Sequence, residues 1–378
     1  MTRSLPGLCA ITFALAGTAL LCGACDEKKN TVSSASPDAG TSADKYALAD
    51  PKLANALQAA ASAAPVNENA PPPDGIFAPG VADRKHPQGA PTTVSMIGDG
   101  DEPRISLAGA PDAMKTSYGP AAIELGMQTG PRMVSPTVDL GMLLGPAKKD
   151  DGGADWLVAE IKRASPAKDQ LGELPPGTDK EIASLGGSQV RIKMSADGAE
   201  SAMDQQLAKG AAPELDRIAK NAAESLVLAT VPLPPTPVGV GAQWIAETRM
   251  PLSSLDVIAY RAFKVKGIDG NRVRLSFDLK AYAASPTTTL GVPKEATMEQ
   301  VDAQAQGELV LVKGEVLARK SSVQMRVVMI FQAPGGADPS DPAPEPGQPP
   351  AGNKTLSAQM QSQATFVRGD DLRAALHP

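Results

Sequence analysis

The sequence predicts an α+β protein in which a curved, half-barrel-like antiparallel sheet packs on one amphipathic helix, after a disordered N-terminal tether. Three observations carry this prediction. Long runs in the last third of the chain alternate apolar and polar residues, as strands with one wet and one dry face do. Residues 214–228 place apolar side chains at helical spacing. The segment up to about residue 91 is rich in Ala, Ser, Pro, Asp and Asn and holds few large apolar residues.

The composition limits both the folded fraction of the chain and its partners. Among 378 residues, the 35 glycines and 35 prolines exceed their usual share, whereas aromatic residues make up only 3%. Part of the chain is therefore not expected to fold. The formal charge of −6 gives no reason to expect a nucleic-acid partner, because phosphate binding needs a clustered basic surface.

Residues 1–24 have the layout of a secretory signal peptide. Arg3 is their only charged residue, an apolar run covers residues 5–21, and small residues precede Cys25. The apolar run is near the lower limit of length for crossing a bilayer, and Gly17 interrupts it. A retained signal-anchor helix is the alternative interpretation.

The end of this segment resembles the lipobox of bacterial lipoproteins. Gly23-Ala24-Cys25 matches its last three positions, whereas Cys22 stands where Leu is usual. The resemblance implies cleavage before Cys25 and lipidation of its thiol with acyl groups such as palmitate. It places the protein in the cell envelope, anchored by lipid to the inner or outer bacterial membrane.

This assignment accounts for the three cysteines of the chain. Cys9 and Cys22 would leave with the signal peptide, and Cys25 would be blocked by lipid. The mature chain would then hold no disulfide, no thiolate nucleophile and no sulfur metal ligand. Its stability is therefore expected to come from a packed core.

Residues 25–91 are predicted to form a flexible tether, because so few large apolar residues cannot offset the entropy of ordering. Asp50 and Pro51 could begin one short helix inside it. His86 also falls in the tether. A single β-rich domain is then expected over residues 92–369.

Short alternating runs between turn residues predict the first strands of this domain. The clearest run is 188–195, where Val190, Ile192 and Met194 alternate with polar residues before the turn signal at Asp197-Gly198. The candidate strands are 92–97, 104–108, 113–118, 121–128, 137–144, 154–164 and 188–195.

Two helices are predicted next. The segment 201–207 is compatible with a short helix. The segment 214–228 is the clear one, because its apolar side chains share one stripe and prolines bound it on both sides. The stripe consists of Leu215, Ile218, Ala219, Ala222 and Leu226, and it is expected to cover the apolar side of the sheet.

The last third gives the strongest evidence for an antiparallel meander. Its runs alternate regularly, and Asp269-Gly270 marks a hairpin turn. Residues 333–353 hold many prolines and cannot join a ladder, so they are predicted to be a disordered insertion before the last strand. Residues 370–378 are expected to be a tail. The predicted strands are 256–266, 271–283, 297–312, 315–332 and 354–367.

Several kinds of catalytic chemistry are improbable for this chain. His86 lies in the tether and His377 is the penultimate residue, so neither is expected on a rigid scaffold, as a catalytic triad or zinc site requires. The loop containing Lys148-Lys149-Asp150-Asp151 lacks ligand spacing and is expected to be solvated. No metal, cofactor or catalytic residue is therefore predicted.

Paired carboxylates could still support glycoside hydrolysis without a histidine. The candidates are Glu247, Asp278, Glu299 and Asp302, but each falls on the polar phase of a predicted strand, where side chains usually face solvent. Trp156 and Trp244 are expected in the core or at its rim rather than as sugar platforms.

The segment 233–244 follows the clear helix and has the pattern L-P-x-x-P-V-x-V-G-x-x-W. It resembles the junction of a family of uncharacterised secreted proteins and lipoproteins of bacteria, and the resemblance covers about residues 188–368. Its prolines would extend the chain, Gly239 and Gly241 would allow a tight turn, and Trp244 would anchor the next strand. The family implies a periplasmic or surface β-rich domain and brings no known activity.

These features together predict a non-enzymatic, membrane-anchored lipoprotein of the cell envelope that acts as a binding or structural module. One alternative is a periplasmic carrier or sensor of an acyl chain held between sheet and helix, suggested by the Met and Leu content of the last strands. Plain core packing would explain the same residues. The second alternative is a carboxylate-dependent enzyme acting on envelope polysaccharide.

Overall fold

The computed structural model describes residues 72–108, 115–130, 133–147, 156–168, 174–194, 200–288, 296–333 and 354–372. Several predictions concern segments outside these ranges. They are the signal peptide, the lipidation site Cys25, the tether up to residue 71, the Lys148–Asp151 loop, the proline-rich insertion from residue 334, and His377.

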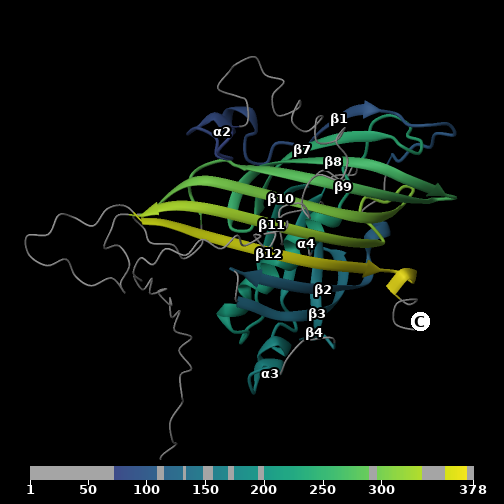
Figure 1. Cartoon of the computed structure of the whole chain (residues 1–378). Helices are drawn as coiled ribbons and strands as arrows, with labels where there is room; N and C mark the ends of the chain where they lie inside the picture. The colour runs from purple at the N-terminus through teal and green to yellow at the C-terminus, as the bar shows by residue number, and fades with distance from the viewer. Residues whose placement is uncertain are drawn as a thin grey trace, which may run out of the picture.

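One antiparallel sheet of twelve strands dominates the described part of the chain, and it curves around α4 (Figure 1). This confirms the predicted fold class. The strand order is β1-β7-β8-β9-β10-β11-β12-β2-β3-β4-β5-β6. The strands are β1 (Thr93–Gly98), β2 (Gly119–Thr129), β3 (Met133–Pro146), β4 (Trp156–Pro166), β5 (Gln189–Met194), β6 (Glu200–Gln206), β7 (Gln243–Leu252), β8 (Leu255–Asp269), β9 (Arg272–Ala283), β10 (Thr297–Val312), β11 (Lys320–Ala333) and β12 (Lys354–Arg368).

The helices within the described ranges are few and short. They are α2 (Val81–Lys85), α3 (Thr178–Ala183) and α4 (Asp216–Ala229), with single 3-10 turns η2 (Lys115–Ser117) and η3 (Pro213–Leu215). α4 matches the helix predicted over 214–228, whereas α3 was not predicted. The guanidinium of Arg261 closes the end of α4 by donating to the carbonyl oxygens of Val227 and Thr230, each at 3.2 Å.

Three short predictions were wrong. The segment 201–207 is strand β6 and not a helix, because it pairs with β5 across a hairpin and so satisfies that strand's backbone groups. Residues 104–108 form only one bridge, between Ile105 and Val238, and residues 115–117 form η2 rather than a strand. In each case the run is too short for its alternation to decide between helix, strand and loop.

The predicted tether ends earlier than expected, because residues 72–91 fold onto the outer face of the sheet. Ile76 bridges Ala283, and Phe77, at 1% exposure, packs with Val81 over the strand β8. The physical reason lies in β8, whose residues 257–263 are buried in both phases and therefore need a cover on each face. The predicted tail is also partly engaged, since Asp371 accepts hydrogen bonds from Arg272 at 2.9–3.2 Å.

In the junction before β7, Trp244 and Gly239 have the roles that the sequence predicted for them. Trp244 is fully buried, donates from its indole nitrogen to the carbonyl of Pro232 at 2.9 Å, and stacks on Phe263 with centroids 5.3 Å apart. Gly239 allows a close backbone approach, because a Cβ there would lie 1.6 Å from the carbonyl oxygen of Asp101. The prediction that Trp244 anchors this strand is confirmed.

The curvature of the sheet brings its far end back toward its beginning. β6, the last strand in the order, approaches β7, and the two form no ladder in the described chain. The seam between them lies beside α4, which contacts β5 and β6 as well as β11, β12 and β2. Within the ranges described, no helix is long and apolar enough to cross a membrane.

Candidate functional site

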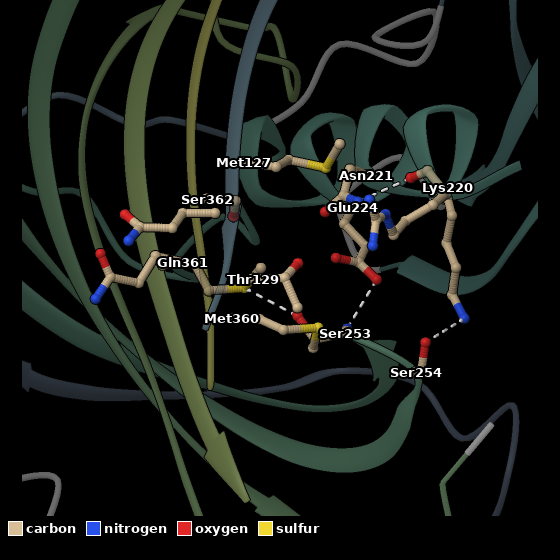
Figure 2. A pocket seen from close by; sticks show the side chains of 13 residues that line it. Met127, Thr129, Lys220, Asn221, Glu224, Ser253, Ser254, Met360, Gln361 and Ser362 are labelled. Carbon is tan, nitrogen blue, oxygen red and sulfur yellow. Dashed lines mark hydrogen bonds between the residues drawn. The ribbon is translucent and has the colours of Figure 1, made fainter. Parts of the chain in front are cut away.

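Two hollows lie beside α4 at the seam, and they share Lys220 and Ser254. Figure 2 shows the side chains that line the inner one. The inner cavity lies between α4, the turn joining β7 to β8, and the strands β2, β11 and β12. Its room for the centres of water molecules is about 40 Å³, which is enough for roughly three waters. The outer pocket is larger, about 600 Å³, and opens between β6 and the β7–β8 hairpin.

Glu224 of α4 is the central polar group of the inner cavity. Its side chain is almost fully buried, at 2% exposure. Its Oε1 accepts a hydrogen bond from the backbone N–H of Ser253 at 2.8 Å, whereas its Oε2 is buried with no hydrogen-bond partner. Figure 2 shows the carboxyl group directed into the space that Met127 and Met360 also face. The site therefore holds a buried acceptor with unused hydrogen-bonding capacity.

The environment of Glu224 favours its neutral form. Burial raises the pKa of Glu224 from 4.5 to about 7, although the Ser253 N–H and the positive charge of Lys220 work in the opposite direction. The carboxyl group consequently changes protonation near neutral pH. When protonated, it can donate a hydrogen bond from the oxygen that has no partner.

The turn between β7 and β8 is held in an unusual backbone conformation. Ser253 and Ser254 have φ values of 49° and 69°, while Leu252 and Leu255 pair on either side. Two-residue turns with positive φ at both positions usually contain Asn or Gly. The conformation directs the Ser253 N–H to Glu224 and lets the Ser254 hydroxyl accept from Lys220 Nζ at 3.3 Å. Backbone strain is thus located at the cavity.

Two cationic side chains line the cavity together with this carboxyl group. Arg217, Lys220 and Glu224 all line the inner cavity, and their spacing of three and four residues places them on one face of α4. In the part of the chain that the structure describes, they are the only ionisable groups that line it. The cavity wall carries a net charge of +1 when Glu224 is ionised and +2 when it is protonated.

The rest of the sheet–helix interface is packed core. Trp244, Phe263 and Phe277 are at most 1% exposed and belong to one continuous cluster that also includes the buried side of α4. Met325 and Met360, which suggested an acyl cavity in the sequence, do line the inner cavity. Core packing and a cavity therefore coexist, with the cavity confined to the end near the hairpin turn.

The structure places the four candidate carboxylates on or near the outer face, away from this cavity. Glu247 accepts from His86 Nε2 at 2.6 Å and pairs with Lys85 at 3.2 Å. Asp302 pairs with Lys280. Glu299 is exposed, whereas Asp278 is buried at 5% exposure, contrary to the expectation that it faces solvent.

Two pairs of these carboxylates, Asp278 with Asp302 and Glu247 with Asp302, are too far apart to act as a glycosidase pair. The register puts Gln306 opposite Asp278, so Asp302 lies four residues, about 13 Å, along the neighbouring strand. Glu247 is three strand spacings from Asp302, about 14 Å. Catalytic carboxyl pairs in glycosidases lie roughly 5–10 Å apart.

The other predicted residues have structural contacts. His86 is only 9% exposed and bonds to Glu247, so its expected place in a flexible tether was wrong. Trp156 is half-buried, with the guanidinium of Arg191 stacked 5.6 Å from its ring. Within the described ranges, no group of three or more His, Cys, Asp or Glu side chains could hold a metal ion.

Sequence reasoning missed Glu224, Lys220 and Ser253. A signal for Glu224 was present, because it is the only charged residue in the run 222–229. That run is buried all round in the structure. A single carboxylate inside an otherwise apolar or small-residue helix segment indicates a buried polar site.

Comparisons with known proteins add little to this description. No family model and no curated protein matches the chain. Among solved structures, the chain is similar to one described as showing lipid–protein interactions in lipovitellin, with 11% identity and a TM-score of 0.36. The match covers 66% of this chain and 25% of that one, so the chain spans about a quarter of its length. A likeness this weak carries no argument about function. Fold and site together define an antiparallel-sheet protein with a cavity that holds the buried carboxyl of Glu224.

Proposed function

We propose that the protein is a non-enzymatic, membrane-anchored module of the cell envelope that binds a single-chain amphiphile at the seam of its sheet. The observation that carries the proposal is the pair of adjoining hollows beside α4, a small inner one that holds the buried carboxyl of Glu224 and a larger outer one whose wall is partly apolar. Such a pair offers separate surroundings for a polar head and an apolar chain.

Part of the outer pocket suits an apolar chain. Its apolar lining comes from Ala202 and Met203 of β6 and from Met250, Pro251 and Leu255 of the β7–β8 hairpin, while Lys220, Arg249 and Asp256 line it as well. Its volume of about 600 Å³ falls in the usual range for small-molecule sites, roughly 300–1,000 Å³. Methionine side chains adapt to ligands of varied shape, because they are flexible and polarizable.

A binding role also agrees with the ionisable groups of the inner cavity. Among the described residues, Glu224 is the one acidic side chain that lines it, and no second carboxyl, histidine or cysteine there could act as a base or nucleophile. Lys220 and Arg217 supply positive charge instead. These groups are arranged to hold a polar head group.

Binding can be tested with dodecyl amphiphiles below their micellar concentration, by calorimetry on the full chain carrying Cys25→Ser. We expect saturable binding of one ligand per chain. Ala202→Trp should fill the outer pocket and weaken binding at least tenfold, whereas Leu143→Trp, on a side chain 45% exposed, should leave it unchanged. Absence of binding by every dodecyl compound would refute the proposal.

The anchor can be tested separately by labelling cells with radioactive palmitate. The wild-type protein and Cys22→Ser should incorporate label and sediment with membranes. Cys25→Ser should do neither. Labelling of Cys25→Ser would show that the proposed attachment site is wrong.

A further inference from the structure

We propose that the amphiphile is a long-chain carboxylic acid, and that it binds head-first, with its carboxylate in the inner cavity against Glu224. This inference rests on the proposed function, because it specifies the head group of the ligand bound at the same site. Protonated Glu224 donates its Oε2 proton to the ligand carboxylate, and Lys220 and Arg217 balance the remaining negative charge.

The hydrogen-bonding state of Glu224 calls for a partner at this position. Oε1 is already occupied by the Ser253 N–H, but Oε2 is buried with none. A buried polar atom without a partner is costly, and most such atoms in folded proteins are paired. An atom of the ligand placed in the cavity would supply the missing hydrogen bond.

The charges around the cavity select the sign of that ligand. A cationic head group would be repelled by Lys220 and Arg217, and Glu224 is neutral for much of the time near pH 7. An anionic head group is attracted by both cations and can accept the proton of Glu224 in a hydrogen bond. An uncharged alcohol would gain the hydrogen bond but not the attraction.

The size of the two hollows fixes the orientation. A carboxylate has three heavy atoms, and the inner cavity has room for roughly three waters. The chain does not fit there, so it must lie in the outer pocket. Lys220 and Ser254 line both spaces, and their hydrogen bond of 3.3 Å stands between them. Release of that bond lets Lys220 turn to the ligand.

Binding should therefore depend on pH. Arg217 and Lys220 are the charged groups that line the cavity with Glu224, and the surrounding strands and hairpin contribute only uncharged side chains such as Gln128, Gln361 and Ser253. Above the pKa of Glu224, two carboxylates would face each other unless one proton is taken up with the ligand. The affinity for the carboxylate ligand should therefore fall about tenfold for each pH unit above the pKa of Glu224.

The test compares dodecanoate, dodecanol and dodecylammonium by calorimetry at pH 6 and pH 8.5, on the full chain carrying Cys25→Ser. We expect dodecanoate to bind most tightly and to lose about 30-fold in affinity between the two pH values, given a Glu224 pKa of about 7. Glu224→Gln keeps a hydrogen-bond donor that does not titrate. The affinity of this variant for dodecanoate should therefore differ less than threefold between pH 6 and pH 8.5. Lys220→Met should weaken dodecanoate but not dodecanol.

The outcomes separate this inference from the proposed function. If dodecanol or dodecylammonium binds as tightly as dodecanoate, or if wild-type binding does not change with pH, the carboxylate assignment is wrong and the amphiphile site stands. If none of the three binds, both proposals fail. If Glu224 had only a structural role, the Glu224→Gln variant and the wild type would show the same dependence of dodecanoate affinity on pH.

Discussion

Two glutamates on opposite sides of the sheet, Glu247 of β7 and Glu224 of α4, have pKa values shifted in opposite directions. On the outer face, burial would raise the pKa of Glu247, but hydrogen bonds from His86 and Tyr260 and the charge of Lys85 outweigh it and lower that pKa to about 2. On the inner side, burial dominates and raises the pKa of Glu224 to about 7.

The difference teaches what each carboxylate does in the fold. Glu247 is surrounded by donors and ties the segment containing α2 to the sheet, so its bonding capacity is used by the protein itself. Glu224 has one donor and one free oxygen, so part of its capacity remains for a ligand. We call Glu247 with Lys85 and His86 the outer clamp. The number of hydrogen-bond partners, more than burial, distinguishes this clamp from the site at Glu224.

The largest expected effect comes from removing the ionisation of Glu224. Its folded-state pKa is raised above 4.5, so the folded chain retains a proton that the unfolded chain has lost, and stability declines as pH rises from about 4.5 to 7. Glu224→Gln removes that decline and should stabilise the protein by about 3 kcal/mol at pH 8. Urea unfolding at pH 8 measures the gain.

The same measurement at pH 4.5 is the control for this prediction. At this pH the Glu224 carboxyl is protonated in the folded chain and about half protonated in the unfolded chain. Glu224→Gln should therefore change the free energy of unfolding by less than about 1 kcal/mol. An equal gain at both pH values would mean that packing, and not ionisation, is responsible.

Breaking the outer clamp should have a smaller effect of the opposite sign. Glu247→Ala leaves Lys85 and His86 without their shared acceptor, and it should cost about 2 kcal/mol at pH 7 because these side chains are partly exposed. The folded-state pKa of Glu247 is lowered, so its contribution is present above pH 4.5 and disappears as pH falls toward 2. Urea unfolding at pH 7 and pH 3 should show the cost shrinking.

Limited proteolysis provides the structural readout of the clamp. Glu247→Ala should expose residues 72–91 to cleavage before the sheet unfolds. Glu299→Ala, an exposed carboxylate on β10, is the matched control and should change stability by less than about 0.5 kcal/mol. Equal protection of residues 72–91 in both variants would contradict the clamp.

The smallest effect concerns the turn that supplies the one donor to Glu224. Ser253→Gly retains the backbone N–H and relieves the positive φ of 49°, so it should stabilise the protein by about 1 kcal/mol. Thermal unfolding at pH 5, where Glu224 is neutral, isolates this contribution. A loss of stability would show that the serine hydroxyl matters more than the backbone strain.

The sequence predicted the sheet better than the site, for a physical reason. Strands β9–β11 bury mainly one face, so their alternation is strong, and α4 begins with a clear apolar stripe. Glu224 lies opposite that stripe, and the pattern alone therefore placed it toward solvent. All residues of the second half of α4 are buried, and the strands that contact this helix include β2, β11 and β12, which are distant in sequence, so the enclosure is a tertiary property.

The same limit explains the error in the tether. Residues 72–91 have little apolar content of their own, but Phe77 and Val81 meet an outer face of β8 that is itself apolar. The signal was in β8, where Ile258, Tyr260 and Ala262 add a second apolar phase to the strand. A strand that is apolar in both phases predicts two covering layers, and only one of them was assigned.

The position of β12 has a consequence for the order in which the chain can fold. β12 pairs with β11 on one side and with β2 on the other, so it alone joins β1 and β7–β11 to β2–β6 by backbone hydrogen bonds. The two halves cannot become one sheet until residues 354–368 have been synthesised, and the closing contacts span most of the domain. Until then the paired edges of β11 and β2 stay open, so closure of the sheet is a late step that depends on one strand.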